Sequence, residues 1–261
     1  MGHAASNAGS ARGVVRSMNW SAWKKSFEVA AQRAVPSIVA PAVSEPVRLG
    51  VLESLQKFQI GESGEGRAAH EIDSAMLPGI DDEFRQSLKM LVREEGRHSR
   101  ILALMVHALG GKTLSRNWSE RVFVHVRRAF GLRFKMLVLL SVEVIGIAWY
   151  GLLAQQLPPG AFADALRQMC GDEERHLAFF SRFFAAQRAW WVPLLWWPLN
   201  LAAGVLVIID HRSTLRSLCV PWHLIARRML SRVAEAAARM NERPAALITR
   251  AVARRRRCAG T

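Results

Sequence analysis

The chain has 261 residues, 51% of them apolar, and its 36 Lys and Arg against 21 Asp and Glu give a net charge of +15. An apolar fraction of this size excludes a globally disordered protein, and the charge favours an anionic partner such as acidic lipid or nucleic acid. The three cysteines are far apart and include no Cys-x-x-Cys pair. A disulfide framework and a cysteine zinc site are therefore not expected, and a reducing compartment fits.

The first residues differ in composition from the rest of the chain. Residues 1–17 are small and polar, and carry Arg12 and Arg16 without an acid. They predict a disordered N-terminal tail, and an organelle transit peptide is the alternative interpretation.

Apolar periodicity predicts an all-α fold after this tail. A single Tyr and few β-branched runs argue against an all-β domain. Turn signals such as Leu77-Pro78-Gly79, Gly110-Gly111 and Leu157-Pro158-Pro159-Gly160 separate the helical patterns. Residues 18–188 are therefore expected to form a bundle of two helical hairpins. Its four long helices are predicted at about 46–77, 82–109, 132–156 and 161–188, with a basic amphipathic stretch at 115–130.

Two Glu-x-x-His pairs suggest metal chemistry. Glu95 and His98 lie in the second predicted helix, and Glu173 and His176 lie in the fourth. Residues three apart on a helix are neighbours, so each pair is able to bind one ion. The sequence therefore contains the same possible half-site twice.

The spacing of two further glutamates strengthens this prediction. Glu143 precedes Glu173 by 30 residues, and Glu65 precedes Glu95 by the same interval. Because each pair straddles a predicted turn, the two carboxylates of a hairpin would meet at one height. The sequence reads as a duplicated hairpin with one Glu followed by Glu-x-x-His.

Glu143 lies in the apolar run 138–147, where an unpaired carboxylate would cost several kcal/mol or stay protonated. Four carboxylates would balance two ferrous ions. Oxygen-rich ligation with one imidazole per metal suits iron or manganese better than a closed zinc site. A metal-free bundle with buried Glu–His and Glu–Arg hydrogen bonds is the alternative.

This pattern resembles the ferritin-like di-iron carboxylate proteins, over about residues 46–188. The motifs Glu143-Val-Ile-Gly and Asp172-Glu-Glu-Arg-His-Leu resemble those of the oxygen-activating branch of this family. That branch includes rubrerythrins, aldehyde-deformylating oxygenases and demethoxyubiquinone hydroxylases. The resemblance implies bridging by Glu95 and Glu173. The full ligand set that it implies is Glu65, Glu95, His98, Glu143, Glu173 and His176.

Several nearby residues leave alternatives open. Glu62 lies 33 residues before Glu95, an interval that resembles rubrerythrin-type spacing, whereas Glu65 reproduces the interval of the second half and is preferred. Asp172 and Glu94 would accept hydrogen bonds from ligand histidines of neighbouring helices, or would be solvated helix charges. His70 is a further candidate beside the ligands.

The last third of the chain holds two unusual segments. Residues 189–209 contain no charge and four tryptophans, and are long enough to cross a bilayer core. We expect segment 189–210 to contact a membrane, as a span or as an in-plane anchor, with a helix buried against the bundle as the alternative. Residues 211–261 carry twelve Arg and two acids. This Arg-rich amphipathic tail would bind anionic lipid, or would be a solvated amphipathic helix with a basic end. It lacks the aromatic interleaving and zinc spacing of nucleic-acid-binding modules.

The resemblance and the apolar segment together imply a function. We expect a non-haem di-iron oxidoreductase that uses two Fe ions, with Mn possible, and O₂ to oxidise a lipophilic substrate of the fatty acyl, fatty aldehyde or quinone type. Because the sequence has no nicotinamide or flavin motif, an external ferredoxin or reductase would donate electrons. The expected location is the cytoplasm at the inner face of a membrane. Alternatives are iron oxidation and storage, a tRNA-modifying di-iron hydroxylase, or a metal-free structural bundle.

Overall fold

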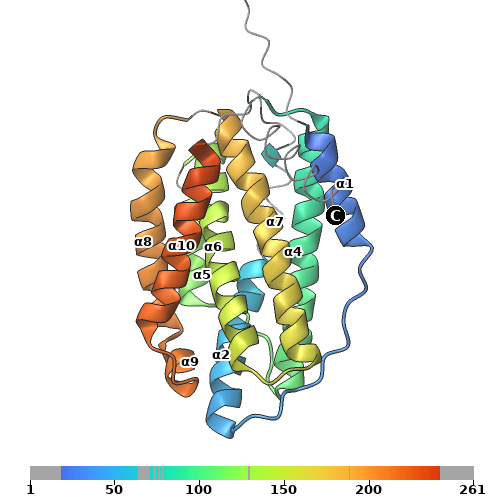
Figure 1. Ribbon diagram of the computed structural model, residues 1–261, viewed down its shortest axis with the longest axis vertical. Coiled ribbons are helices and arrows are strands. Elements are labelled where there is room, and N and C mark those ends of the chain that lie inside the picture. Colours follow the sequence, from blue (N-terminus) through green and yellow to red (C-terminus); the bar gives the residue numbers. More distant parts are fainter. Residues whose placement is uncertain are drawn as a thin grey trace, which may run out of the picture.

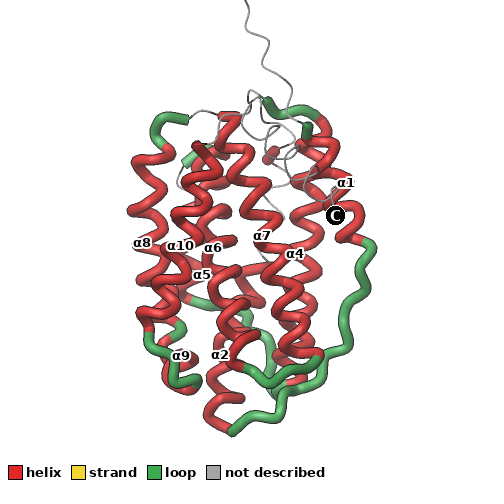
Figure 2. Tube along the Cα trace, in the orientation of Figure 1, coloured by secondary structure: helices red, strands yellow, loops and turns green. Residues whose placement is uncertain are grey.

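The computed structural model describes residues 19–63, 71–72, 75, 77, 79–128, 130–187 and 189–241. Within these residues the chain is all-helical and has no strand (Figures 1 and 2). This confirms the predicted all-α class. The predicted tail 1–17 and the end of the Arg-rich segment, 242–261, lie outside the described residues. The helices are α1 (Trp20–Ala31), α2 (Glu45–Glu62), α4 (Asp82–Ala108), α5 (Trp118–Arg128), α6 (Leu132–Gln156), α7 (Ala161–Gln187), α8 (Val192–Asp210), α9 (Arg212–Ser217) and α10 (Trp222–Asn241).

Local signals in the sequence set the ends of α4, α6 and α7 close to the predicted positions. The side chain of Asp81 caps α4 by accepting a 2.8 Å hydrogen bond from the backbone N–H of Phe84. Gly110, at φ +80°, follows the end of α4, and Gly160, at φ +151°, stands directly before α7. Glycine tolerates these backbone angles without a steric penalty, so turns form where the hairpins need them.

The first long helix is shorter than predicted in the part that the structure describes. Helix α2 begins beside Pro46, as expected, and ends at Glu62. Residues 64–70, where the prediction continued the helix, lie outside the described residues. Residues 63–81 separate α2 from α4 in the sequence, whereas residues 157–160 separate α6 from α7.

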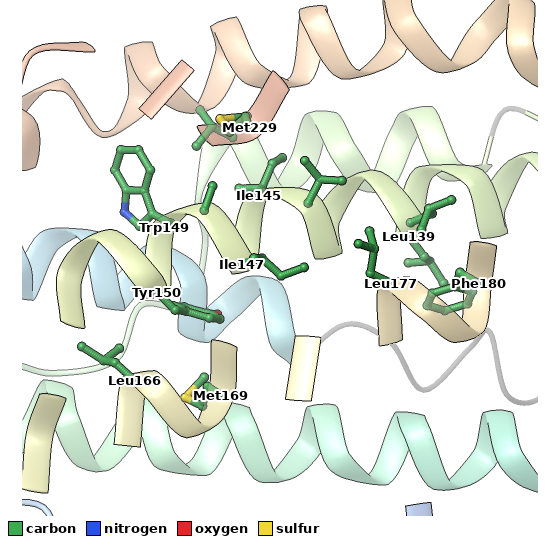
Figure 3. Packing of buried hydrophobic residues seen from close by; sticks show 14 of the residues in the cluster. Leu139, Ile145, Ile147, Trp149, Tyr150, Leu166, Met169, Leu177, Phe180 and Met229 are labelled. Atoms are coloured by element: carbon green, nitrogen blue, oxygen red, sulfur yellow. The ribbon is translucent and has the colours of Figure 1, made fainter. Parts of the chain in front are cut away.

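Helix α6 is the central element of the core. It packs most extensively on α7, and α10 covers another side of it. In Figure 3, Ile145 and Trp149 of α6 lie between Met229 of α10 and the α7 residues Leu166 and Met169. A helix that is apolar on all sides needs such burial on all sides.

The three C-terminal helices belong to the same core. Trp196 and Val207 of α8 and Ile225 of α10 are buried in it. Helix α9 lies tightly against α2, because Thr214 Oγ1 donates a 2.7 Å hydrogen bond to the carbonyl of Gly50. A side chain at Gly50 would collide with α9, so glycine is required for this close approach.

Candidate metal centre

Six ionisable side chains from α2, α4, α6 and α7 converge in the interior. They form two groups, and in each group the potential ligand atoms all lie within 4.8 Å of one another. Glu95 and Glu173 belong to both groups. The first group also contains Glu62 and His98, and the second also contains Glu143 and His176. The shared glutamates are thus the two side chains placed to bridge a pair of ions.

Both imidazoles turn their Nδ1 atoms toward the shared glutamates. His176 Nδ1 lies 2.6 Å from Glu95 Oε1 and 3.2 Å from Glu173 Oε2. His98 Nδ1 lies 3.1 Å from Glu173 Oε1 and 3.5 Å from Glu95 Oε2. Both histidines are fully buried. The histidine of α4 and the histidine of α7 thus make equivalent contacts, and the two halves of the cluster are related by approximate two-fold symmetry.

The atoms at the centre of the cluster lack hydrogen bonds. Glu95 Oε1, Glu173 Oε1, His98 Nδ1 and His176 Nδ1 are buried, and none has a partner with hydrogen-bond geometry among the described residues. Unpartnered buried polar atoms are costly, and here four of them, two carboxylate oxygens and two imidazole nitrogens, converge on shared space. This arrangement fits a divalent metal in each group, because a cation satisfies all of these atoms together.

The opposite nitrogen of each imidazole contacts a carboxylate from the other motif. His176 Nε2 lies 2.9 Å from Glu94 Oε2, and His98 Nε2 lies 3.4 Å from Asp172 Oδ2. Glu94 directly precedes Glu95, and Asp172 directly precedes Glu173. If each Nε2 carries the proton, each Nδ1 presents its lone pair to the cluster, as a metal ligand must. The cross-helix contacts considered in the sequence analysis are thus present.

Arginines hold this outer pair of carboxylates ionised. Arg175 reaches both, at 2.6 Å from Glu94 Oε1 and 2.9 Å from Asp172 Oδ1, and Arg33 lies 2.6 Å from Asp172 Oδ1. Although burial opposes ionisation, the hydrogen bond with His98 and the charge of Arg175 hold the pKa of Asp172 well below its usual range. A chain of contacts therefore runs from the partly exposed Arg33 and Arg175 through these two carboxylates to the buried histidines.

Protons balance the inner cluster when it holds no cation. Burial, and then the charges of Glu95 and Glu173, raise the pKa of Glu62; burial and Glu173 likewise raise that of Glu143. Burial opposes ionisation of both shared glutamates, but the charge of His176 lowers the pKa of Glu95, and a hydrogen bond with Glu143 lowers that of Glu173. These carboxylates in turn raise the pKa of His98 and of His176 against burial, so protonated imidazoles balance them when the cluster holds no cation. The cluster thus separates into two carboxylates that favour the protonated form and two that favour the ionised form. Four ionised carboxylates require an added cation.

Tyr150 is a site residue that the sequence analysis missed. Its phenol donates a 2.5 Å hydrogen bond to Glu62 Oε1, and the side chain is fully buried. The available signal was its position: it is the only tyrosine, and it follows Glu143 by seven residues, or two helical turns. Residues at this spacing share one face of a helix, so α6 presents both toward the cluster.

Glu65 and His70 lie outside the described residues, whereas Glu62, the alternative to Glu65, lies in the cluster. The choice of Glu65, which rests on the equal 30-residue intervals, therefore stays a prediction, and Glu62 is the glutamate of α2 that the described residues bring into the cluster.

Apolar space lies beside the carboxylates. A small cavity of about 20 Å³ is lined by Phe58, Leu139, Val142 and Gly146 together with four of the cluster glutamates. A larger, mostly apolar pocket of about 450 Å³ lies near the N-terminal ends of α6 and α8, and its lining includes Leu132, Phe134, Trp191 and Leu195.

Comparison of the chain with protein-family models, curated proteins and solved structures finds no match. The assignment of this centre therefore rests on the geometry of the side chains: a buried Glu/His cluster at metal-ligand distance, which is compatible with iron binding.

Proposed function

We propose that the protein is a ferritin-like di-iron oxidoreductase. The observation that carries this proposal is the convergence of unpartnered carboxylate oxygens and imidazole Nδ1 atoms in two groups that share Glu95 and Glu173. Glu62 and His98 would complete one site, and Glu143 and His176 the other. Each site would have one nitrogen and several oxygen donors, a set that suits iron or manganese.

Four carboxylates and two neutral imidazoles would neutralise two divalent ions. Bound ferrous iron would supply electrons for the reduction of O₂. Glu94 and Asp172 would keep the proton of each histidine on Nε2, which leaves Nδ1 free to bind metal. The phenol of Tyr150 would donate its hydrogen bond to Glu62 Oε1 and so orient that carboxylate. The buried surroundings would exclude bulk water from the reaction.

A lipophilic substrate is favoured by the apolar space. Phe58, Leu139 and Val142 line the cavity beside the carboxylates, and the larger pocket begins roughly one and a half turns before Leu139 on the same helix. A fatty acyl, fatty aldehyde or quinone-type molecule has the apolar surface that such walls select. An external ferredoxin or reductase would supply the electrons that return the iron to the ferrous state.

Metal analysis of the full chain tests this proposal. Purified with iron, the wild type should contain about two ions per chain, and Glu143→Gln should lose at least one. Glu174→Gln is the matched control, because Glu174 adjoins Glu173 but its side chain is half exposed and pairs with Arg232. Wild-type iron content in Glu143→Gln would refute the ligand assignment.

Oxygen consumption then tests the reaction class. After anaerobic reduction, the wild type should consume O₂ in proportion to its iron, and Glu143→Gln should not. Size-exclusion chromatography distinguishes the storage alternative, since a storage protein forms a large cage whereas an enzyme of this kind would be a small assembly.

A further inference from the structure

Helix α8 turns an entirely apolar face away from the protein. Every exposed residue of this helix is apolar. Six residues form a stripe with spacings of three and four that continues into the preceding turn, and the two most exposed are Trp190 (79%) and Leu194 (66%). A helix on the surface of a monomer normally carries polar residues on its outer face. The stripe, which we call the α8 face, consists of Trp190, Leu194, Trp197, Leu201, Val205 and Ile209.

The opposite side of α8 is fixed to the bundle along its whole length. Trp196 Nε1 donates a 2.9 Å hydrogen bond to the carbonyl of Val233 in α10. Near the middle, Gly204 allows close contact with Met229. At the end, Asp210 lies 3.2 Å from Lys57 Nζ of α2. Since α8 cannot leave the bundle without breaking these contacts, only its outer face is available to a partner.

The position of α8 at the edge of the bundle allows its whole outer face to contact a flat surface. Helix α8 forms one edge of the bundle, opposite α1, with α10 beside it (Figure 1). Helices α6 and α8 are the two described helices long and apolar enough to cross a membrane by length and composition. The first is buried in protein, as its central Glu143 predicted, whereas two thirds of α8 is not.

Charge and tryptophan placement indicate the partner. The three helices α5, α9 and α10 all contact α8. They carry the exposed arginines Arg121, Arg128, Arg212, Arg216 and Arg227. Exposed tryptophans lie at both ends of α8: Trp190 precedes it, and Trp118, 51% exposed, donates a hydrogen bond to Asp210 at its end. Tryptophans at both ends of an apolar stripe, with exposed arginines on the helices that contact it, are typical of a membrane interface.

We propose that the α8 face docks on a bilayer containing anionic lipid, with α8 lying in the plane of the interface. A second copy of the chain is disfavoured as the occupant because two molecules of charge +15 repel each other. This proposal is independent of the metal centre. It also places the pocket wall residues Trp191 and Leu195 next to the lipid surface.

Flotation of the full-length protein with vesicles tests the docking. The wild type should float with phosphatidylcholine vesicles that contain phosphatidylglycerol, and the double variant Leu194→Glu/Leu201→Glu should bind about a hundredfold more weakly. The matched control is Val29→Glu/Leu104→Glu, which makes the same change of charge at exposed apolar positions of α1 and α4 and should bind like the wild type. Iron content should be unchanged in both variants.

Three results would overturn the proposal. Wild-type protein that stays in solution with the vesicles that contain phosphatidylglycerol would show that the face does not bind lipid. Equal binding by the α8 double variant and the wild type would show that the charge of the chain, and not the α8 face, is responsible. A wild-type dimer that the α8 double variant converts to a monomer, without vesicle binding, would assign the face to a second copy.

Discussion

The phenol of Tyr150 donates a 2.5 Å hydrogen bond to Oε1 of Glu62, and thereby joins the C-terminal half of α6 to the last turn of α2. Burial, and then the charge of Glu62, raise the pKa of this tyrosine well above its ordinary value, so that it remains a donor at any physiological pH. The contact fixes the orientation of a carboxylate that we propose as a metal ligand.

Removing this hydroxyl should weaken metal binding without unfolding the protein. We expect Tyr150→Phe to bind iron about 10–100-fold more weakly, as is usual when a partner of a ligand is removed. Competition with a chelator of known affinity measures the effect. Ser181→Ala is the control, because Ser181 has a buried hydroxyl without a hydrogen-bond partner among the described residues. An unchanged affinity in Tyr150→Phe would assign the hydroxyl a purely structural role.

The carboxylates behind the histidines should act as a matched pair. Asp172→Asn and Glu94→Gln each remove the charge that favours a proton on the facing Nε2. Each variant should lose about 10–100-fold in metal affinity, measured by the same competition. Glu174→Gln, on the exposed side of the same motif, should retain wild-type affinity. Similar losses in all three variants would indicate a general effect of charge.

A pair of alanine variants identifies the ligand from the first half of the chain. Because Glu62 lies within the cluster, Glu62→Ala should lose at least one iron per chain while Glu65→Ala retains both. Elemental analysis of the two purified proteins measures this directly. The reverse result would identify Glu65 as the ligand, as the equal intervals in the sequence predicted.

His211 should make the folded protein sensitive to acid. Burial, and the charge of Lys57, lower its pKa from 6.5 to about 3. Below pH 6.5 the unfolded chain takes up a proton at this imidazole, and the folded protein does not until about pH 3. As the pH is lowered from 6.5 to about 3, the free energy of unfolding therefore decreases, and this group contributes about 1.4 kcal/mol per pH unit to the decrease.

Urea denaturation at several pH values measures this slope. His211→Asn, which leaves a hydrogen-bonding group beside Ser54, should be less sensitive to acid than the wild type. His223→Asn is the control, because His223 is exposed and its replacement should leave the slope unchanged. If His211→Asn and the wild type lose stability equally on acidification, the buried imidazole is not the source.

The sequence by itself determined the all-α class, the bounds of α4, α6 and α7, and the two Glu-x-x-His pairs. These features are local: an apolar period, a turn glycine and a three-residue spacing each act within one helix or one turn. The burial of Glu143 was also predictable, because its neighbours on every side of α6 are apolar.

Tertiary structure alone decided which residues meet across helices. The height of Glu62 in the bundle depends on the length of the connection between α2 and α4, which no spacing within a helix reveals. The contacts of Glu94 with His176 and of Tyr150 with Glu62 depend on how neighbouring helices are rotated and placed side by side. Apart from the buried Asn200 and Asp210, the sequence of α8 is apolar, so only the packing of its neighbours determined which apolar side chains are buried and which are exposed.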